Sequence, residues 1–140
     1  MIAEELQIGD YIQNPLGLVG QVQSIKYMPK DHGDEYGDYY LVTLAFGESD
    51  QTFNINDAQP IPLTPEILEK NTSESNKNVF GGMNYALNAD YFIENRGDRF
   101  CFSRRMAGHK YSTFWVCDIH YVHDLQHLIK LVGIDKKIQI

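Results

Sequence analysis

The sequence predicts an α+β protein in which an N-terminal small SH3-like β-barrel is followed by an antiparallel β-meander with a C-terminal amphipathic helix. Three observations support this fold class. Residues 1–60 hold four or five short alternating stretches separated by turn-forming residues, as expected for a small barrel. Residues 83–117 repeat that pattern, and residues 121–132 then change to a helical period. The proline-rich segment 60–65 divides the chain into modules 1–60 and 61–140.

The first module is expected to consist of short strands. A strand is expected at residues 6–12, and another at 19–27 with a bulge near Ser24, where the alternation breaks. The clearest strand places four apolar side chains on one face: Tyr40, Val42, Leu44 and Phe46. Phe53 and Ile55 mark a fourth strand. A curled sheet of such strands would leave few open edges.

The second module is expected to begin with a short helix. Thr64 is suited to the N-cap position, and Pro65 and Glu66 to the first turn. The helix should end near Lys70, and the polar composition of residues 71–78 predicts a loop.

Two further strands and one hairpin are expected after that loop. A strand is expected at residues 83–87, and a hairpin joins residues 91–95 to 99–103. Gly97 would supply the positive φ that such a turn requires. The last strand is expected at residues 111–117, directly before the C-terminal helix.

The C-terminal helix has one apolar arc. At 100° per residue, that arc holds Val122, Leu125, Leu128, Ile129 and Val132. Gly133 can end the helix in the left-handed conformation. No ideal capping box precedes the helix, so Asp118 or His120 is expected to serve as its cap. The arc should cover the sheet of the second module.

The net charge of −7 is distributed unevenly along the chain. Residues 1–60 hold ten acidic and two basic residues, a balance of −8. Residues 61–140 hold nine acidic and ten basic residues, a balance of +1. The first module should therefore repel nucleic acid, which disfavours duplex nucleic acid as a partner of the whole chain.

The chain is expected to be cytoplasmic and to have no membrane partner. No stretch approaches the roughly 20 apolar residues that span a bilayer. The first five residues are acidic and lack the apolar segment of a signal peptide. Cys101 and Cys117 both fall in expected strands, so they are interpreted as reduced core thiols.

A family resemblance rests on three motifs: Leu6-Gln-Ile-Gly-Asp-Tyr-Ile12, Ile61-Pro-Leu-Thr-Pro-Glu-Ile-Leu-Glu-Lys-Asn71 and Tyr121-Val-His-Asp-Leu-Gln126. Together they resemble an uncharacterised family of small proteins from gut Bacteroidetes and their phages or mobile elements. The resemblance covers most of the chain in outline, although Thr72 and Ser73 stand where family members have a Gly-Phe pair. It implies a bacterial or phage origin and no particular chemistry.

A histidine cluster is the sharpest candidate site. His123 and His127 are one helical turn apart, and His120 lies one turn earlier. With Asp124 nearby, three imidazoles could hold Zn²⁺ with water in an open position, as in a metal-dependent hydrolase. The preferred interpretation is a solvated helix face opposite the apolar arc, because no His-Glu-x-x-His pattern is present. No cofactor is therefore expected.

Cations and aromatic residues are interleaved near the last hairpin. The cations are Arg99, Arg104, Arg105 and Lys110, and the aromatic neighbours include Phe100, Phe102, Tyr111 and Trp115. Such a set could bind single-stranded nucleic acid, with the cations following phosphates and the rings stacking on bases. The same spacing suits a buried sheet face, so the core is the preferred place for Phe100, Phe102, Phe114 and Trp115.

The preferred function is that of a non-enzymatic binding or accessory protein acting on an unidentified protein partner. Small barrels often present an aromatic-lined groove to peptides, and Tyr36, Tyr39 and Tyr40 would line it here. This expectation rests on analogy with the fold. A metal-dependent hydrolase and a single-strand binding protein are the alternatives.

Three other motifs have simpler explanations. The acidic segment 31–38 could bind Ca²⁺ but does not fit the EF-hand frame, so a connecting loop is preferred. Cys117 near His120 has no recognisable nucleophile signature around it. The triplet Arg96-Gly97-Asp98 is explained by a hairpin turn.

Overall fold

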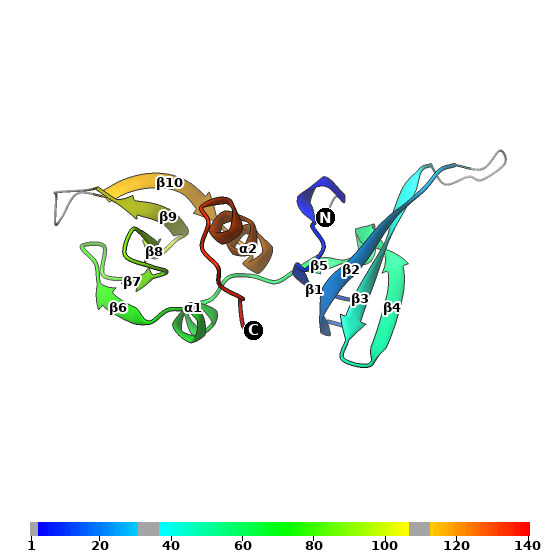
Figure 1. Ribbon diagram of the computed structural model, residues 1–140, viewed down its shortest axis with the longest axis horizontal. Helices are drawn as coiled ribbons and strands as arrows, with labels where there is room; N and C mark the ends of the chain where they lie inside the picture. The colour runs from blue at the N-terminus through cyan, green and yellow to red at the C-terminus, as the bar shows by residue number, and fades with distance from the viewer. Residues whose placement is uncertain (1–2, 31–36, 107–112) are drawn as a thin grey trace. The chain divides into compact units, whose positions relative to one another are not determined.

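The computed structural model describes residues 3–30, 37–106 and 113–140 (Figure 1). The chain divides into two compact units, Met1–Ile61 and Pro62–Ile140, called unit 1 and unit 2 below. Each unit has a five-stranded antiparallel sheet, and unit 2 adds two α-helices, so the predicted α+β class is confirmed. Among the described residues, no helix has the length and apolar character needed to cross a membrane.

Unit 1 consists of five strands and two 3₁₀ turns. In chain order they are η1 (Ala3–Glu5), β1 (Tyr11–Gln13), β2 (Val19–Met28), β3 (Tyr39–Phe46), β4 (Ser49–Asn54), η2 (Ile55–Asp57) and β5 (Gln59–Pro60). The sheet order is β4-β3-β2-β1-β5. The first strand is shorter than predicted because the Asp10 carboxylate accepts a hydrogen bond from the Gln7 amide at 2.7 Å and turns the chain.

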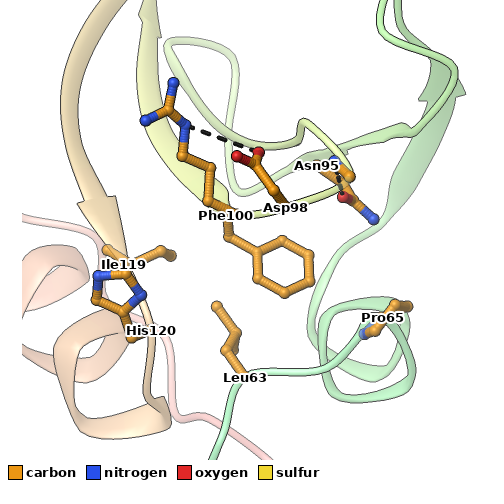
Figure 2. Close-up of a pocket in the computed structure, with 9 residues that line it drawn as sticks. Leu63, Pro65, Asn95, Asp98, Phe100, Ile119 and His120 are labelled. Carbon is orange, nitrogen blue, oxygen red and sulfur yellow. Dashed lines mark hydrogen bonds and ion pairs between the residues drawn. The ribbon is translucent and has the colours of Figure 1, made fainter.

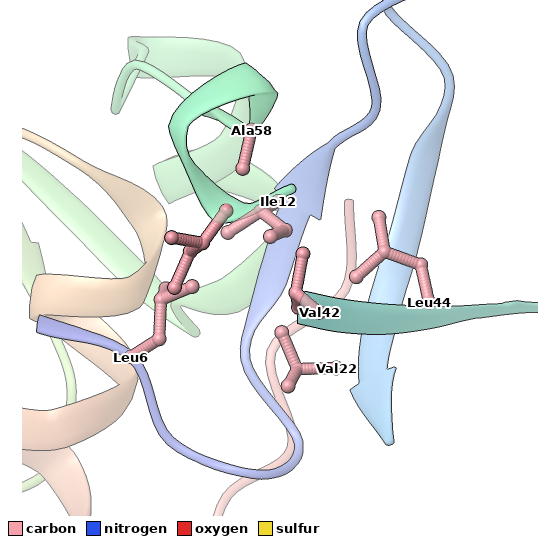
Figure 3. Close-up of a cluster of buried hydrophobic side chains, with 7 residues drawn as sticks. Leu6, Ile12, Val22, Val42, Leu44 and Ala58 are labelled. Atoms are coloured by element: carbon pink, nitrogen blue, oxygen red, sulfur yellow. The ribbon is translucent and has the colours of Figure 1, made fainter. Parts of the chain in front are cut away.

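The core of unit 1 follows the alternation of β3, as predicted. Val42 and Leu44 are fully buried, and Tyr40 and Phe46 pack against the same cluster. Figure 3 shows the buried side chains gathered between the strands, and the full set is Leu6, Ile12, Val22, Val42, Leu44, Ile55 and Ala58. The pairing of β2 with β3 shifts register between Val22 and Ser24, which confirms the expected bulge. Ile55 lies in η2 and not in a fourth strand.

Unit 2 begins with a helix and continues as a meander. Its elements are α1 (Pro65–Asn71), β6 (Glu74–Lys77), β7 (Met83–Ala86), β8 (Tyr91–Asn95), β9 (Phe100–Arg105), β10 (Thr113–Ile119) and α2 (Val122–Leu131). The sheet order is β10-β9-β8-β7-β6. The Thr64 hydroxyl accepts from the Ile67 amide at 3.3 Å, so the predicted cap of α1 is confirmed.

The loop predicted for residues 71–78 is wrong, because β6 lies within that segment. β6 pairs with β7 from Glu74 opposite Ala86 to Lys77 opposite Met83. Its polar composition suits an edge strand, where both faces can remain in water. Composition alone does not separate such a strand from a loop.

The ends of α2 are defined by backbone hydrogen bonds. Tyr121 is the N-cap residue, and the Asp124 carboxylate accepts from the amides of His120 at 3.1 Å and Tyr121 at 3.0 Å. The expectation that Asp118 or His120 would be the cap is therefore wrong, since the helix is capped backwards from its third residue. At the other end, the Ile134 amide donates to the Ile129 carbonyl at 2.8 Å, and Gly133 has φ +76°, as a Schellman ending requires.

The apolar arc of α2 is buried as predicted, but the histidine arc is not solvated throughout. Val122, Leu125 and Ile129 are buried. His123, expected to face solvent, is only 5% exposed, because its ring stacks on Tyr121 with centroids 5.5 Å apart and planes 8° apart. The planar imidazole ring can stack on an aromatic ring and be buried. Counting histidine as a polar residue in the helical pattern therefore did not predict its burial.

Candidate functional site

The register of β8, β9 and β10 places one cation between two aromatic rings. Arg104 pairs with Phe114 on one side and with Tyr91 on the other. Residues directly opposite one another in antiparallel strands share a face of the sheet. Tyr91, Arg104 and Phe114 therefore form a line across three strands, called the arginine–aromatic row below. The Arg104 guanidinium carbon lies 5.8 Å from the centroid of the Tyr91 ring.

The row is open to solvent at the β10 end. Phe114 is 62% exposed, Arg104 is exposed, and Tyr91 is half-buried against Phe102, with ring centroids 5.4 Å apart. On the opposite face, Trp115 is 53% exposed, and the guanidinium carbon of Arg105 lies 5.8 Å from the Phe92 ring centroid.

The prediction that Phe114 and Trp115 belong to the core is wrong, whereas Phe102 is buried as expected. Figure 1 shows α2 beside the C-terminal end of β10, because the helix follows that strand almost directly. The helix therefore covers the sheet near Ile119 and leaves the start of β10 open. Alternation identifies the strand but does not say how much of its length is covered.

Arg99 and Lys110, two of the other predicted cations, are not placed in the row. Arg99 lies at the opposite end of β9, where its Nη1 is 3.6 Å from Oδ2 of Asp118 and its Nε is 4.0 Å from Oδ1 of Asp98. Lys110 lies outside the described residues, as does Tyr111. Of the predicted set, Arg104 is the cation in the row, whereas Arg105 lies on the opposite face beside Phe92.

Asp118 fixes the orientation of Trp115. Its Oδ1 accepts from the Trp115 indole Nε1 at 3.2 Å and from the Cys101 thiol at 3.2 Å. The hydrogen bond from Cys101 is the main reason that the pKa of Asp118 is lowered. This partner was not predicted, although a carboxylate three residues after a strand tryptophan could have suggested it.

Neither cysteine is prepared to act as a nucleophile. Burial is the main cause that raises the pKa of Cys101 to about 11, and burial also raises the pKa of Cys117. Both thiols are therefore protonated at neutral pH, whereas a nucleophilic cysteine requires the thiolate. Cys117 shares a face with its partner Phe102, so it projects from the opposite face to Cys101.

The three histidines of the predicted metal site do not converge. His120 is exposed, His123 is buried, and His127 is half-buried, with the ring centroids of His123 and His127 5.9 Å apart and their planes 64° apart. Over residues 3–30, 37–106 and 113–140, no three His, Cys, Asp or Glu side chains are grouped as a metal site would need.

The tyrosines predicted to line a peptide groove are partly buried. Tyr39 and Tyr40 are half-buried on β3, and Tyr36 lies outside the described residues, as does most of the acidic segment 31–38. Tyr40 packs against Tyr27 with ring centroids 5.2 Å apart. The Tyr27 hydroxyl donates to Asp38 at 2.6 Å, which raises the pKa of Tyr27 and lowers that of Asp38.

Unit 2 also contains a hollow of about 340 Å³ that the sequence did not reveal. Figure 2 shows the Phe100 ring in the centre of this hollow, with Leu63 below it and Ile119 and Pro65 on either side. The charged residues at its rim, Asp98 and Arg99, form an ion pair with each other. The lining is mixed, with Leu63, Pro65, Phe100 and Ile119 beside Asn95, Asp98, Arg99 and His120. The arginine–aromatic row is the stronger candidate site, because it joins a cation to two rings and is exposed at Arg104 and Phe114.

Comparison of the chain with protein-family models, curated proteins and solved structures finds no match. The function is therefore proposed from the residues of the arginine–aromatic row.

Proposed function

We propose that the protein is a non-enzymatic binding protein of a bacterial phage or mobile element, and that unit 2 binds single-stranded nucleic acid through the arginine–aromatic row. The observation that carries this proposal is the exposed Phe114 ring directly opposite Arg104, with Tyr91 on the far side of the same cation. The three motifs that resemble proteins of Bacteroidetes phages support the stated origin.

The dimensions of the row suit unstacked bases. Adjacent strands lie about 4.8 Å apart, so Phe114 on β10 and Tyr91 on β8 are separated by about 10 Å. Two bases could then stack on the two rings, each contact worth about 1–3 kcal/mol, while the guanidinium between them binds a phosphate. Bases in a duplex are already stacked on each other, so the row favours single strands.

The local charge is compatible with a phosphate backbone although the whole chain is acidic. Residues 96–110 contain five basic residues and one acidic residue, a balance of +4. Unit 1 carries the acidic excess and should weaken binding at low salt compared with a neutral chain. The cationic segment should still give affinity that falls as the salt concentration rises.

Peptide binding by unit 1 is a second candidate. The sheet order β4-β3-β2-β1-β5, with a 3₁₀ turn before the last short strand, supports the proposed SH3-like barrel. Tyr27 and Tyr40 form a ring pair on β2 and β3, and Tyr27 is exposed. An aromatic pair at the surface of a small barrel could contact a proline-rich peptide.

Single-strand binding can be measured by the fluorescence anisotropy of an end-labelled oligonucleotide, because the only tryptophan, Trp115, lies on the opposite face of the sheet from the row. A labelled 15-nucleotide oligothymidylate should bind more tightly at 50 mM than at 200 mM salt. Phe114→Ala and Arg104→Ala should each weaken binding about 5- to 100-fold, in line with the stacking contribution.

A matched control exists elsewhere in unit 2. Phe80 is also an exposed ring with an arginine over it, since the Arg96 guanidinium carbon lies 4.8 Å from its centroid. Phe80→Ala should leave the affinity unchanged. Equal affinities of wild type, Phe114→Ala and Arg104→Ala would exclude the row as the binding site, and preference for the annealed duplex would exclude single-strand recognition.

A further inference from the structure

The sheet of unit 2 has one edge that differs from the other sheet edges of the protein. β10 and β6 are the two edge strands of unit 2, and β4 and β5 are those of unit 1. An open edge can pair with another chain, so edge strands usually carry features that prevent pairing. Such features are present on β4, β5 and β6, whereas β10 carries an exposed apolar stretch.

Three of the edges are protected. β4 is polar and exposed from Ser49 to Thr52, β5 has two residues and includes Pro60, and β6 has four residues and ends in Lys77. A charged side chain, as at Asp50 of β4, short length, proline and lysine all discourage pairing with a further strand.

β10 has the opposite composition. Phe114, Trp115 and Val116 are consecutive, apolar and 62%, 53% and 40% exposed. Its one irregularity is the register shift between Trp115 and Cys117, which bends the strand but leaves both aromatic residues paired with β9. In the described part of the chain, β10 has a strand partner on the β9 side only.

The backbone just beyond β10 already pairs with an extended segment. The Leu63 amide donates to the His120 carbonyl at 2.9 Å, and Pro62 forms an antiparallel bridge with Tyr121. Extended chain can therefore pair next to the end of β10, and the part from Phe114 to Asp118 is the stretch left for a further strand.

We propose that β10 accepts an added strand from an extended, acidic segment of a partner protein. Arg104 and Arg105 project from opposite faces of β9 beside this edge, and both are exposed. Carboxylates on an added strand could pair with either arginine, and apolar side chains could lie beside Phe114 and Trp115. A second copy of this chain would instead bring arginines near arginines. Charge thus favours an acidic peptide over self-association.

Strand addition depends on the backbone of β10, so it can be tested separately from nucleic-acid binding. The probe is an eight-residue peptide of alternating valine and glutamate with blocked ends. Two control peptides carry N-methyl groups on one or the other set of alternate amides, so one of them cannot donate hydrogen bonds toward β10. Calorimetry gives the affinity, and hydrogen exchange reports on the amides of Phe114 to Asp118.

The unmodified peptide should bind and slow exchange along β10, and one N-methylated peptide should bind at least tenfold more weakly. Val116→Lys should weaken peptide binding similarly, whereas Leu131→Lys, at an exposed apolar position on α2, should not. Absence of binding, equal affinity of all three peptides or unchanged exchange in β10 would overturn the proposal. So would self-association of the wild type that Val116→Lys abolishes, because the occupant would then be a second copy.

Absence of peptide binding at β10 would not affect the test of nucleic-acid binding, since the peptides and oligothymidylate are measured in separate experiments. If the wild type binds the peptide but not oligothymidylate, the β10 edge binds a partner strand and the proposed nucleic-acid function is excluded.

Discussion

Asp118 contacts the side chains of Cys101, Trp115 and Arg99, and its charge state should affect stability at low pH. The Cys101 thiol, the Trp115 indole and Arg99 lower its pKa below the ordinary 3.8. A carboxylate with a lowered folded-state pKa stabilises the fold above its unfolded-state value, and this contribution is lost as the pH falls through the folded-state value.

Asp118→Asn should therefore lower the free energy of unfolding at pH 7 and reduce its decline below about pH 4. Urea denaturation from pH 7 to pH 2.5 measures both effects. Asp38 and Glu66 also have lowered pKa values, because the Tyr27 hydroxyl and the Glu66 backbone amide donate to them, so part of the acid sensitivity should remain. Asp135→Asn, in the exposed tail, is the control, and an equal effect of both substitutions would contradict this account.

Single residues show where sequence reasoning succeeds. The cap at Thr64 and the helix end at Gly133 were predictable, because each depends on a few adjacent residues. The burial of His123 was not, since it depends on stacking against Tyr121. The exposure of Phe114, the outer ring of the arginine–aromatic row, was not predictable either, since it depends on how much of the sheet α2 covers.

Among the elements, α1 is joined to the C-terminal tail by one side chain. The Asn71 amide donates to the Ile67 and Gln139 carbonyls and accepts from the Gln139 amide, each at 2.7 Å. Asn71 is 2% exposed, and the neighbouring tail residue Ile138 is buried. The side chain thus pairs with the tail as a neighbouring strand would.

Asn71→Ala should lower the free energy of unfolding by about 1–3 kcal/mol, because it removes the three hydrogen bonds that this buried side chain makes to the backbone of Ile67 and Gln139. Urea denaturation measures the change, and Asn76→Ala, on the exposed strand β6, should change it by less than about 0.5 kcal/mol. Similar effects of the two substitutions would show that the contacts of Asn71 with the tail do not stabilise the fold.

At the same scale, regular alternation predicted β3 and the β8–β9 hairpin, because apolar side chains on one face reveal the period. β6 escaped prediction since both of its faces are polar. Its pairing with β7 is specified by the fold of the whole sheet and not by its own residues.

For the whole molecule, the uneven charge predicts different salt responses of the two units. Unit 1 has a balance of −8 and unit 2 of +1. The screening length falls from about 30 Å at 0.01 M to about 8 Å at 0.15 M ionic strength. Added salt should therefore relieve repulsion within unit 1 and change unit 2 little.

Hydrogen exchange can separate the two units, because core amides report their local free energy of opening. Raising sodium chloride from 10 to 150 mM should slow exchange at Val42 and Leu44 severalfold, with little change at Ile93 and Phe102. An equal response in both units would mean that self-repulsion does not limit the stability of unit 1.

The opposite directions of Cys101 and Cys117 on the unit 2 sheet have a consequence for oxidation. The sheet separates the two sulfur atoms, so an oxidant cannot join them into an internal disulfide without breaking the β9–β10 pairing. Any cross-link formed by the folded protein must connect two molecules, and oxidising conditions cannot add a covalent restraint to the fold.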